Sequence, residues 1–264
     1  MKKGGGMIGY QIKGTVVIGI LIFGLMGCRS TNPMDKIDEW DLVYISDSTG
    51  WGVAEKYGRN IERYTGKTVN VHNYAMGNMS ALRVLNALRS DPPTHPLQAD
   101  IQEAEVIVFF ANPRGPQSEG GVQGGMEKCI AGRYAPDDCS LQLYEPYIKN
   151  LISIYQEIFR LRDGEATIIR AIGFYNPLIS RHRENGIDKE CTECFETFNQ
   201  AVHMAADEFG IPFVSVFDAF NGVNHDEDPR EKGYIGSDGI HASEEGQQVI
   251  ADILSESGYE PMAP

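Results

Sequence analysis

Two groups of polar side chains in this sequence could together carry out nucleophilic catalysis. Ser48 follows an apolar run in "DLVYISDSTG", and Asp238 and His241 lie three residues apart in "SDGIHASEEGQ" near the end of the chain. A serine hydroxyl is a weak nucleophile and needs a neighbouring base to take its proton. Imidazole titrates near neutral pH, and a carboxylate on its other nitrogen fixes the tautomer and stabilises the imidazolium. Ser48, His241 and Asp238 are therefore candidates for the nucleophile, the base and the acid.

Each polar residue that follows a predicted strand also has an ordinary structural explanation. Ser48 or Thr49 could cap a helix, Gly77 could be a turn residue, and Asn112 could form the turn before Pro113. For any one of these positions alone, the structural explanation is the simpler one. Their occurrence together, in this order along the chain, favours a shared chemical role.

The segments that must position these residues alternate between two patterns. Short apolar runs rich in β-branched residues predict buried parallel strands at 41–46, 68–75, 105–111, 166–172 and 211–216. Apolar residues at helical spacing predict helices at about 52–64, 78–90, 143–162, 192–209 and 243–256. This alternation predicts βαβ units and a three-layer α/β/α sandwich with a central, mostly parallel five-stranded sheet. Such sheets bind ligands beyond the carboxyl ends of their strands.

The order of these segments resembles the SGNH (GDSL-like) hydrolases over nearly all of the chain after the N-terminal segment. The segments that carry the resemblance to the family's four blocks are "ISDST", "NYAMG", "FFANP" and "DGIHASEEGQ". No G-x-S-x-G occurs, so the nucleophile elbow of the α/β-hydrolases is absent. The resemblance implies a flavodoxin-like sandwich and a serine esterase or acyl hydrolase that cleaves carboxylic esters.

The resemblance also implies a role for each matching residue. Ser48 would be the nucleophile, His241 the base and Asp238 its acid partner. The backbone N–H of Ser48, the backbone N–H of Gly77 and the side-chain amide of Asn112 would form the oxyanion hole. Asp47, beside the nucleophile, would be its neighbour rather than its base.

The sequence departs from the family in its first and third blocks. Ser46 and Thr49 replace the usual glycine and leucine of the first block. Phe110 replaces the usual glycine of the third block, and Pro113 follows its asparagine. The altered third block and two long irregular segments, at 113–140 and 220–237, keep a second hypothesis open. In that hypothesis the chain is a binding protein that keeps the fold without catalysis.

The identity of the ester also stays open at this stage. A lipid ester and an O-acetyl group on a cell-surface sugar both suit the same residues. No cofactor and no catalytic metal are expected, because no other histidine has a second ligand at convincing spacing. The histidines concerned are His72, His95, His182, His203 and His225.

Residues 1–27 resemble the signal peptide of bacterial lipoproteins. A basic start precedes an uncharged apolar run, 14–27, which is shorter than the roughly 20 residues that a spanning helix needs. The run ends in "LMGC", which resembles a lipobox and implies lipidation of Cys28. An uncleaved signal anchor is the alternative. We expect a tether at 28–40 and the hydrolase domain at 41–264, on the cell membrane and outside the cytoplasm.

Net charge limits the partners of this chain. Removing residues 1–27, which contain three lysines and no acids, changes the formal charge from −14 to −17 over the remaining 237 residues. Nucleic-acid phosphates and anionic headgroups would repel such a surface. We therefore expect no nucleic-acid partner and a lipid rather than a basic patch as the membrane anchor. We also expect a monomer.

Four further cysteines, Cys129, Cys139, Cys191 and Cys194, lie in the predicted domain. In an exported chain they favour two disulfides, most simply between the two pairs that are near in sequence. A four-cysteine zinc site and free thiols are the alternatives.

Overall fold

The computed structural model describes residues 33–264, except residues 78, 92–95, 113–127, 130–138 and 263–264. The residues from Pro33 to Pro264 form one compact unit. Met34 and Trp40, which precede the expected domain start, are buried in its core. The expected signal segment, Cys28, Pro113 and His95 lie outside the described residues.

A five-stranded parallel sheet with the order β2-β1-β3-β4-β5 forms the centre of the molecule. Its strands are β1 (Glu39–Ser46), β2 (Thr68–Ala75), β3 (Val106–Phe109), β4 (Ile168–Ile172) and β5 (Phe213–Val214). The inner strands β3 and β4 are buried at every position, while edge strand β2 has no buried position. This pattern confirms the prediction of a mainly parallel sheet covered on both faces.

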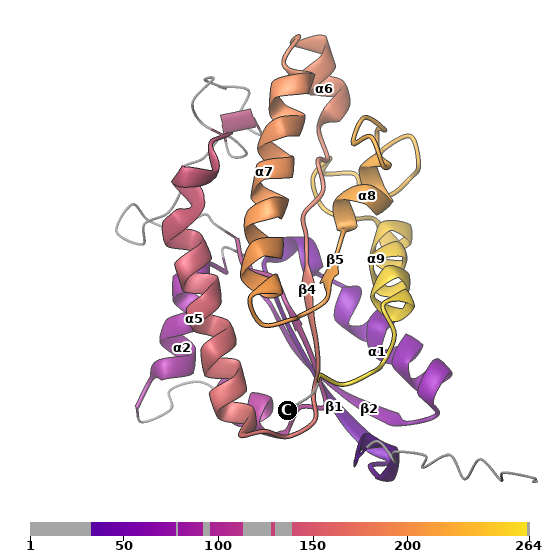
Figure 1. Ribbon diagram of the computed structural model, residues 1–264. Helices are drawn as coiled ribbons and strands as arrows, with labels where there is room; N and C mark the ends of the chain where they lie inside the picture. The colour runs from indigo at the N-terminus through magenta and orange to yellow at the C-terminus, as the bar shows by residue number, and fades with distance from the viewer. Residues whose placement is uncertain (1–32, 78, 92–95, 113–127, 130–138, 263–264) are drawn as a thin grey trace, which may run out of the picture. The chain divides into compact units, whose positions relative to one another are not determined.

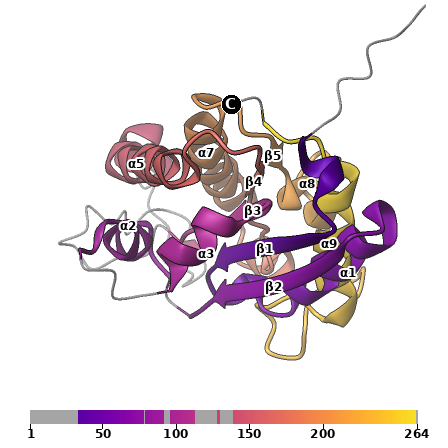
Figure 2. The ribbon, with the colours of Figure 1, turned by 90° about the horizontal axis from the view of Figure 1, so that it is seen from below.

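Helices cover both faces of this sheet (Figures 1 and 2). One face carries α1 (Val53–Thr65), α8 (Val216–Asn221) and α9 (Glu244–Glu256). The other carries α2 (Ala81–Arg89), α3 (Leu97–Glu103), α5 (Glu145–Arg162) and α7 (Asp188–Asp207), and α6 (Ile179–Glu184) lies at one end of α7. The predicted three-layer sandwich is therefore confirmed. The short helices α3, α6 and α8 were not predicted, because six or seven residues give little periodic signal.

The order of the strands brings the carboxyl ends of β1 and β3 together in the interior of the sheet. From β1 the chain moves outward to β2, and it then crosses back to place β3 on the other side of β1. The connections therefore leave β1 and β3 in opposite directions, which makes their carboxyl ends the switch point where such sheets bind ligands. Ser48 follows β1 and Asn112 follows β3, so both lie at this point.

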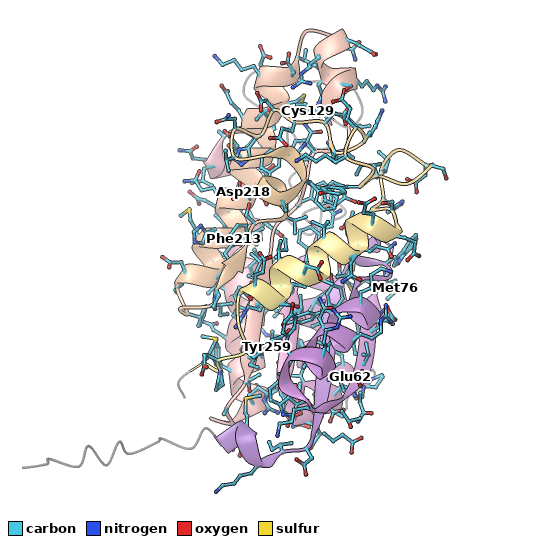
Figure 3. All side chains as sticks on the ribbon, turned by 90° about the vertical axis from the view of Figure 1, so that its right-hand side faces the viewer. Glu62, Met76, Cys129, Phe213, Asp218 and Tyr259 are labelled. Carbon is cyan, nitrogen blue, oxygen red and sulfur yellow. A yellow bond between two sulfur atoms is a disulfide. The ribbon has the colours of Figure 1, made fainter. Side chains whose placement is uncertain are left out.

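Two disulfides join α7 to the segment that precedes α5. They are Cys129–Cys191 and Cys139–Cys194, with Cα–Cα distances of 5.6 and 4.8 Å. The expected pairing of sequence neighbours is therefore wrong, as are the zinc and free-thiol alternatives. Cys191 and Cys194 lie one turn apart on the same buried stripe of α7, so both side chains point at the neighbouring segment rather than at each other. Cys129 lies at the α6 end of the molecule (Figure 3).

Loss of the Cys129–Cys191 bridge should lower the stability of the domain. This disulfide closes a loop across a sequence separation of 62 residues. Bridges that close long loops typically stabilise proteins by about 2–4 kcal/mol, mainly by constraining the unfolded chain. The Cys129→Ser/Cys191→Ser variant should therefore show a lower urea midpoint than the parent protein. An unchanged midpoint under non-reducing conditions would contradict this expectation.

Candidate active site

Ser48, His241 and Asp238 form a continuous chain of hydrogen bonds. Ser48 Oγ lies 2.9 Å from His241 Nε2, although the two residues are 193 positions apart in the sequence. His241 Nδ1 lies 2.6 Å from Asp238 Oδ2. The imidazole therefore has a hydroxyl at one nitrogen and a carboxylate at the other, which is the geometry of a nucleophile with its base and the acid that orients the base.

The turn after β1 places Ser48 at the sheet edge. Residues Ser48–Gly50 form a short 3₁₀ turn, and the Asp47 carboxylate caps it by accepting the Thr49 N–H at 2.8 Å. A Cβ on Gly50 would lie 2.3 Å from Ser46 Oγ, so this tight turn requires glycine there. The cap of α1 is Gly52, with φ of 75°. Ser48 is thus not the cap of α1.

Asp238 and His241 lie in a tight loop that leads into α9. The loop is closed by an antiparallel bridge between Ile235 and Ala242 and by the bond from Gly236 N–H to the His241 carbonyl. The Tyr175 hydroxyl donates to the Ile240 carbonyl at 2.9 Å and ties the loop to the segment after β4. The loop thus holds His241 against the end of the sheet that carries Ser48.

The surroundings of Asp238 keep its carboxylate charged. Its Oδ1 accepts the backbone N–H of Ile240 and that of His241, each at 2.9 Å. The Ile240 N–H, the His241 imidazole and the His241 N–H, in that order, lower the pKa of Asp238 to about 2. Asp238 is therefore ionised throughout the neutral pH range.

The three residues expected to stabilise an oxyanion approach the same edge. Met76 N–H bonds the Ser46 carbonyl at 3.0 Å and so places Gly77 beside the turn that holds Ser48. Asn112 is buried, and its Nδ2 donates to Asp47 Oδ2 at 2.7 Å. The buried Asp47 therefore binds both the nucleophile turn and Asn112, a link that sequence reasoning missed.

Phe110, the altered residue of the third block, contributes to the core rather than to the site. Phe110 is 1% exposed, and its ring packs against the rings of Phe174 and Phe198 at 5.8 and 6.1 Å between centroids. The bond from Phe110 N–H to the Ile45 carbonyl keeps this stretch paired with β1. The phenylalanine thus fills space between the sheet and α7, and Asn112 still reaches the site edge.

Trp51 is a further aromatic residue at the site, and sequence reasoning did not identify it. Its ring stacks on the His241 ring with centroids 5.1 Å apart and an angle of 21° between planes. It is nevertheless 48% exposed. The signal that could have found it is a large aromatic three residues after the nucleophile, between Gly50 and Gly52.

The other described histidines make their contacts with residues outside the candidate site. His182 is buried in α6, and burial lowers its pKa although the Cys129 carbonyl opposes that shift. His72 is half-buried, and its Nε2 lies 2.9 Å from Asp41 Oδ1. Within the described part of the chain, no three His, Cys, Asp or Glu side chains are placed to hold a metal ion.

Among the same residues, no helix has the length and apolar character of a membrane span.

His225 gives the fold a pH-dependent contribution to stability. Burial by itself would lower its pKa, but bonds to Glu196 at 2.8 Å and Asp218 at 2.7 Å raise it. The charged form therefore stabilises the fold below about pH 6.5, and this contribution disappears as the pH rises through the raised pKa. In urea unfolding, His225→Gln should cost about 1 kcal/mol at pH 5.5 and little at pH 9. An equal cost at both pH values would contradict the assignment.

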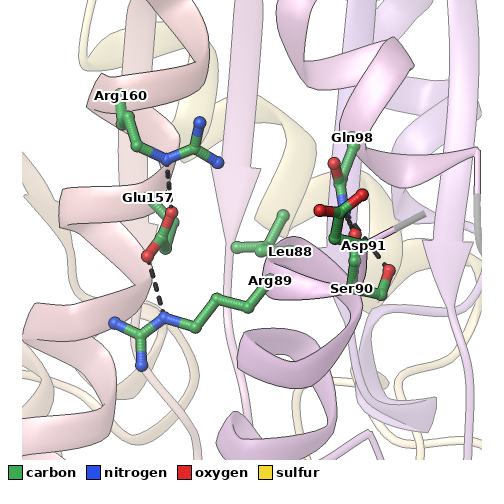
Figure 4. Close-up of a pocket in the computed structure, with 7 residues that line it drawn as sticks. All are labelled: Leu88, Arg89, Ser90, Asp91, Gln98, Glu157 and Arg160. Atoms are coloured by element: carbon green, nitrogen blue, oxygen red, sulfur yellow. Dashed lines mark hydrogen bonds and ion pairs between the residues drawn. The ribbon is translucent and has the colours of Figure 1, made fainter. Parts of the chain in front are cut away.

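A surface pocket of about 330 Å³ lies away from these residues (Figure 4). It is at the Arg89 end of α2, whereas the bridge from Ser80 to Asn112 places the other end of α2 at the site. Glu157 accepts from Arg89 Nε at 2.8 Å and from Arg160 Nε at 2.7 Å. Glu157 therefore ties α2 to α5 inside the pocket.

No protein-family model and no curated protein sequence matches the chain. Solved structures of similar fold do match. The lipase Lip_vut3 from a goat rumen metagenome has a TM-score of 0.61 and 16% identity, covering 84% of this chain and 98% of its own. The lipase/acylhydrolase from Enterococcus faecalis has a TM-score of 0.51 and 14% identity, covering 85% and 100%. This chain therefore shares the α/β fold of these two proteins.

Proposed function

We propose that this protein is a serine esterase that acts through an acyl-enzyme on Ser48. The observation that carries the proposal is the hydrogen-bonded chain from Ser48 Oγ through His241 to Asp238. It lies at the switch point of the sheet, where ligands bind in this class of fold. The lipases and acylhydrolases that share the fold support the same reaction class.

The geometry supports a two-step reaction. His241 Nε2 takes the Ser48 proton as Oγ attacks the ester carbon, and the imidazolium then protonates the alcohol as the C–O bond breaks. Water, deprotonated by the same nitrogen, next attacks the acyl-enzyme and releases the carboxylic acid and free Ser48. Asp238 holds the Nδ1–H throughout, which keeps Nε2 facing the reacting atoms.

Negative charge develops on the ester carbonyl oxygen in both steps. The backbone N–H of Ser48 belongs to the first turn of a 3₁₀ helix, where amides have no partner within the helix. Together with the Gly77 N–H and the Asn112 amide, it would receive the oxyanion. One such donor is typically worth about 2.7–4 kcal/mol in the transition state.

The proposal includes a location outside the cytoplasm, with lipid on Cys28 as the anchor. Two disulfides among the four cysteines of the compact unit support an oxidising compartment. The apolar run and "LMGC" of the sequence support the anchor. Metabolic labelling with a fatty-acid analogue would test it, with Cys28→Ala as the variant expected to lose the label.

Covalent labelling tests the nucleophile. Purified protein starting at Cys28 should hydrolyse p-nitrophenyl acetate and react one-to-one with a fluorophosphonate probe on Ser48. Ser48→Ala should take up no probe. Ser140→Ala, which removes an exposed hydroxyl that makes no capping bond, should react like the parent. A parent protein that stays unlabelled would favour a binding protein with this fold.

A further inference from the structure

The indole of Trp51 extends along one side of the proposed reactive centre. One of its faces stacks on the imidazole of His241 at 5.1 Å. Its Cζ2 edge lies 4.0 Å from the position that a Cβ on Gly77 would occupy. The ring therefore reaches from the base to one of the expected oxyanion donors. It is 48% exposed, so part of its apolar surface faces solvent beside the site.

The chemistry of ester cleavage decides which half of the substrate meets this ring. The departing alcohol oxygen must approach His241 Nε2, because that nitrogen supplies its proton. The carbonyl oxygen instead points at the oxyanion donors. A group attached to the alcohol oxygen therefore extends past the imidazole, and the indole stacked on that imidazole offers it a large apolar surface.

We infer that Trp51 is a specificity-determining residue that binds the alcohol half of the ester. The inference rests on the proposed esterase function. A flat indole face favours an alcohol with a flat ring, either an aryl group or the C–H face of a sugar ring, over a short flexible chain. Stacked aromatic pairs are worth about 0.5–1.5 kcal/mol beyond the area that they bury.

Acetate esters with one acyl group and different alcohols test the inference. Trp51→Ala should lower kcat/KM by about 2- to 12-fold for phenyl acetate or for an acetylated methyl glucoside, and by less than about twofold for ethyl acetate. The ester with the larger loss identifies the ring type. Hydrolysis of the acetyl-enzyme should keep its rate, because the alcohol has already left. Trp51→Phe should retain most of the preference.

An equal loss for all three esters, or a slower hydrolysis of the acetyl-enzyme, would overturn the inference. Trp51 would then act on the imidazole rather than on the alcohol. The absence of any loss would overturn it as well.

A binding measurement separates this inference from the esterase proposal. Saturation-transfer NMR on Ser48→Ala, with phenyl acetate and the acetylated glucoside as probes, should show transfer to ring protons of the alcohol. The added Trp51→Ala substitution should remove this transfer. If the parent hydrolyses no ester while this result holds, the esterase proposal fails, and the binding of the alcohol ring by Trp51 stands. Without transfer in Ser48→Ala, the inference fails even if the parent is an active esterase.

Discussion

Asp238→Asn should lower kcat for ester hydrolysis by about 10⁴-fold and leave the fold intact, as in serine proteases with the equivalent change. The two backbone N–H groups on Oδ1 require an acceptor, so the new amide would keep its oxygen there. Its NH₂ would then face His241 Nδ1, which could only accept. The imidazole proton would move to Nε2, and the base could no longer take the Ser48 proton.

Steady-state kinetics with p-nitrophenyl acetate between pH 5 and pH 9 would measure this loss. Since the pKa of Asp238 is about 2, its carboxylate is charged over this whole range, and the loss should not shrink toward pH 5. Asp226→Asn is a matched control, because Asp226 is an exposed carboxylate in the segment before the same loop. A loss below tenfold with an unchanged circular dichroism spectrum would remove Asp238 from the proposed role.

The alternating strands and helices could be predicted from the sequence, because their residue patterns recur along the whole chain. Buried runs such as Val106–Phe109 are apolar at every position, and this pattern identifies an inner parallel strand without any tertiary information. The rule that ligands bind beyond strand ends then selected Ser48 and Asn112. The Asp238–His241 pair was predictable because three residues of separation in a loop allow direct contact.

Features that depend on which surfaces meet in three dimensions could not be predicted. The cysteine pairing depends on the direction in which Cys191 and Cys194 project from α7. Likewise, the Asp47–Asn112 bond joins residues that follow different strands, and it follows from the adjacency of β1 and β3 in the sheet. Trp51 was missed because its partner His241 is brought to it only by the last loop.

Asn112→Ala should lower kcat by about 10²–10³-fold with little change in KM, because it removes a donor used mainly in the transition state. The side-chain amide of Asn112 donates to Asp47 Oδ2 at 2.7 Å, and this bond orients the group. The substitution also leaves a buried Asp47 oxygen without this partner. Urea unfolding should therefore accompany the kinetics, so that kcat refers to folded protein.

A double-mutant cycle with Asp47→Ala tests whether Asp47 acts through Asn112. If the carboxylate orients the amide, Asp47→Ala should lower kcat by itself and add little in the Asn112→Ala background. Independent roles would give losses that multiply. A matched control for the turn is Thr49→Val, which removes the hydroxyl bond to Asp47 Oδ1 and keeps the backbone bond to the same oxygen. Thr49→Val could lower kcat as much as Asp47→Ala does. In that case Asp47 acts on the turn that holds Ser48, and it does not act by orienting Asn112.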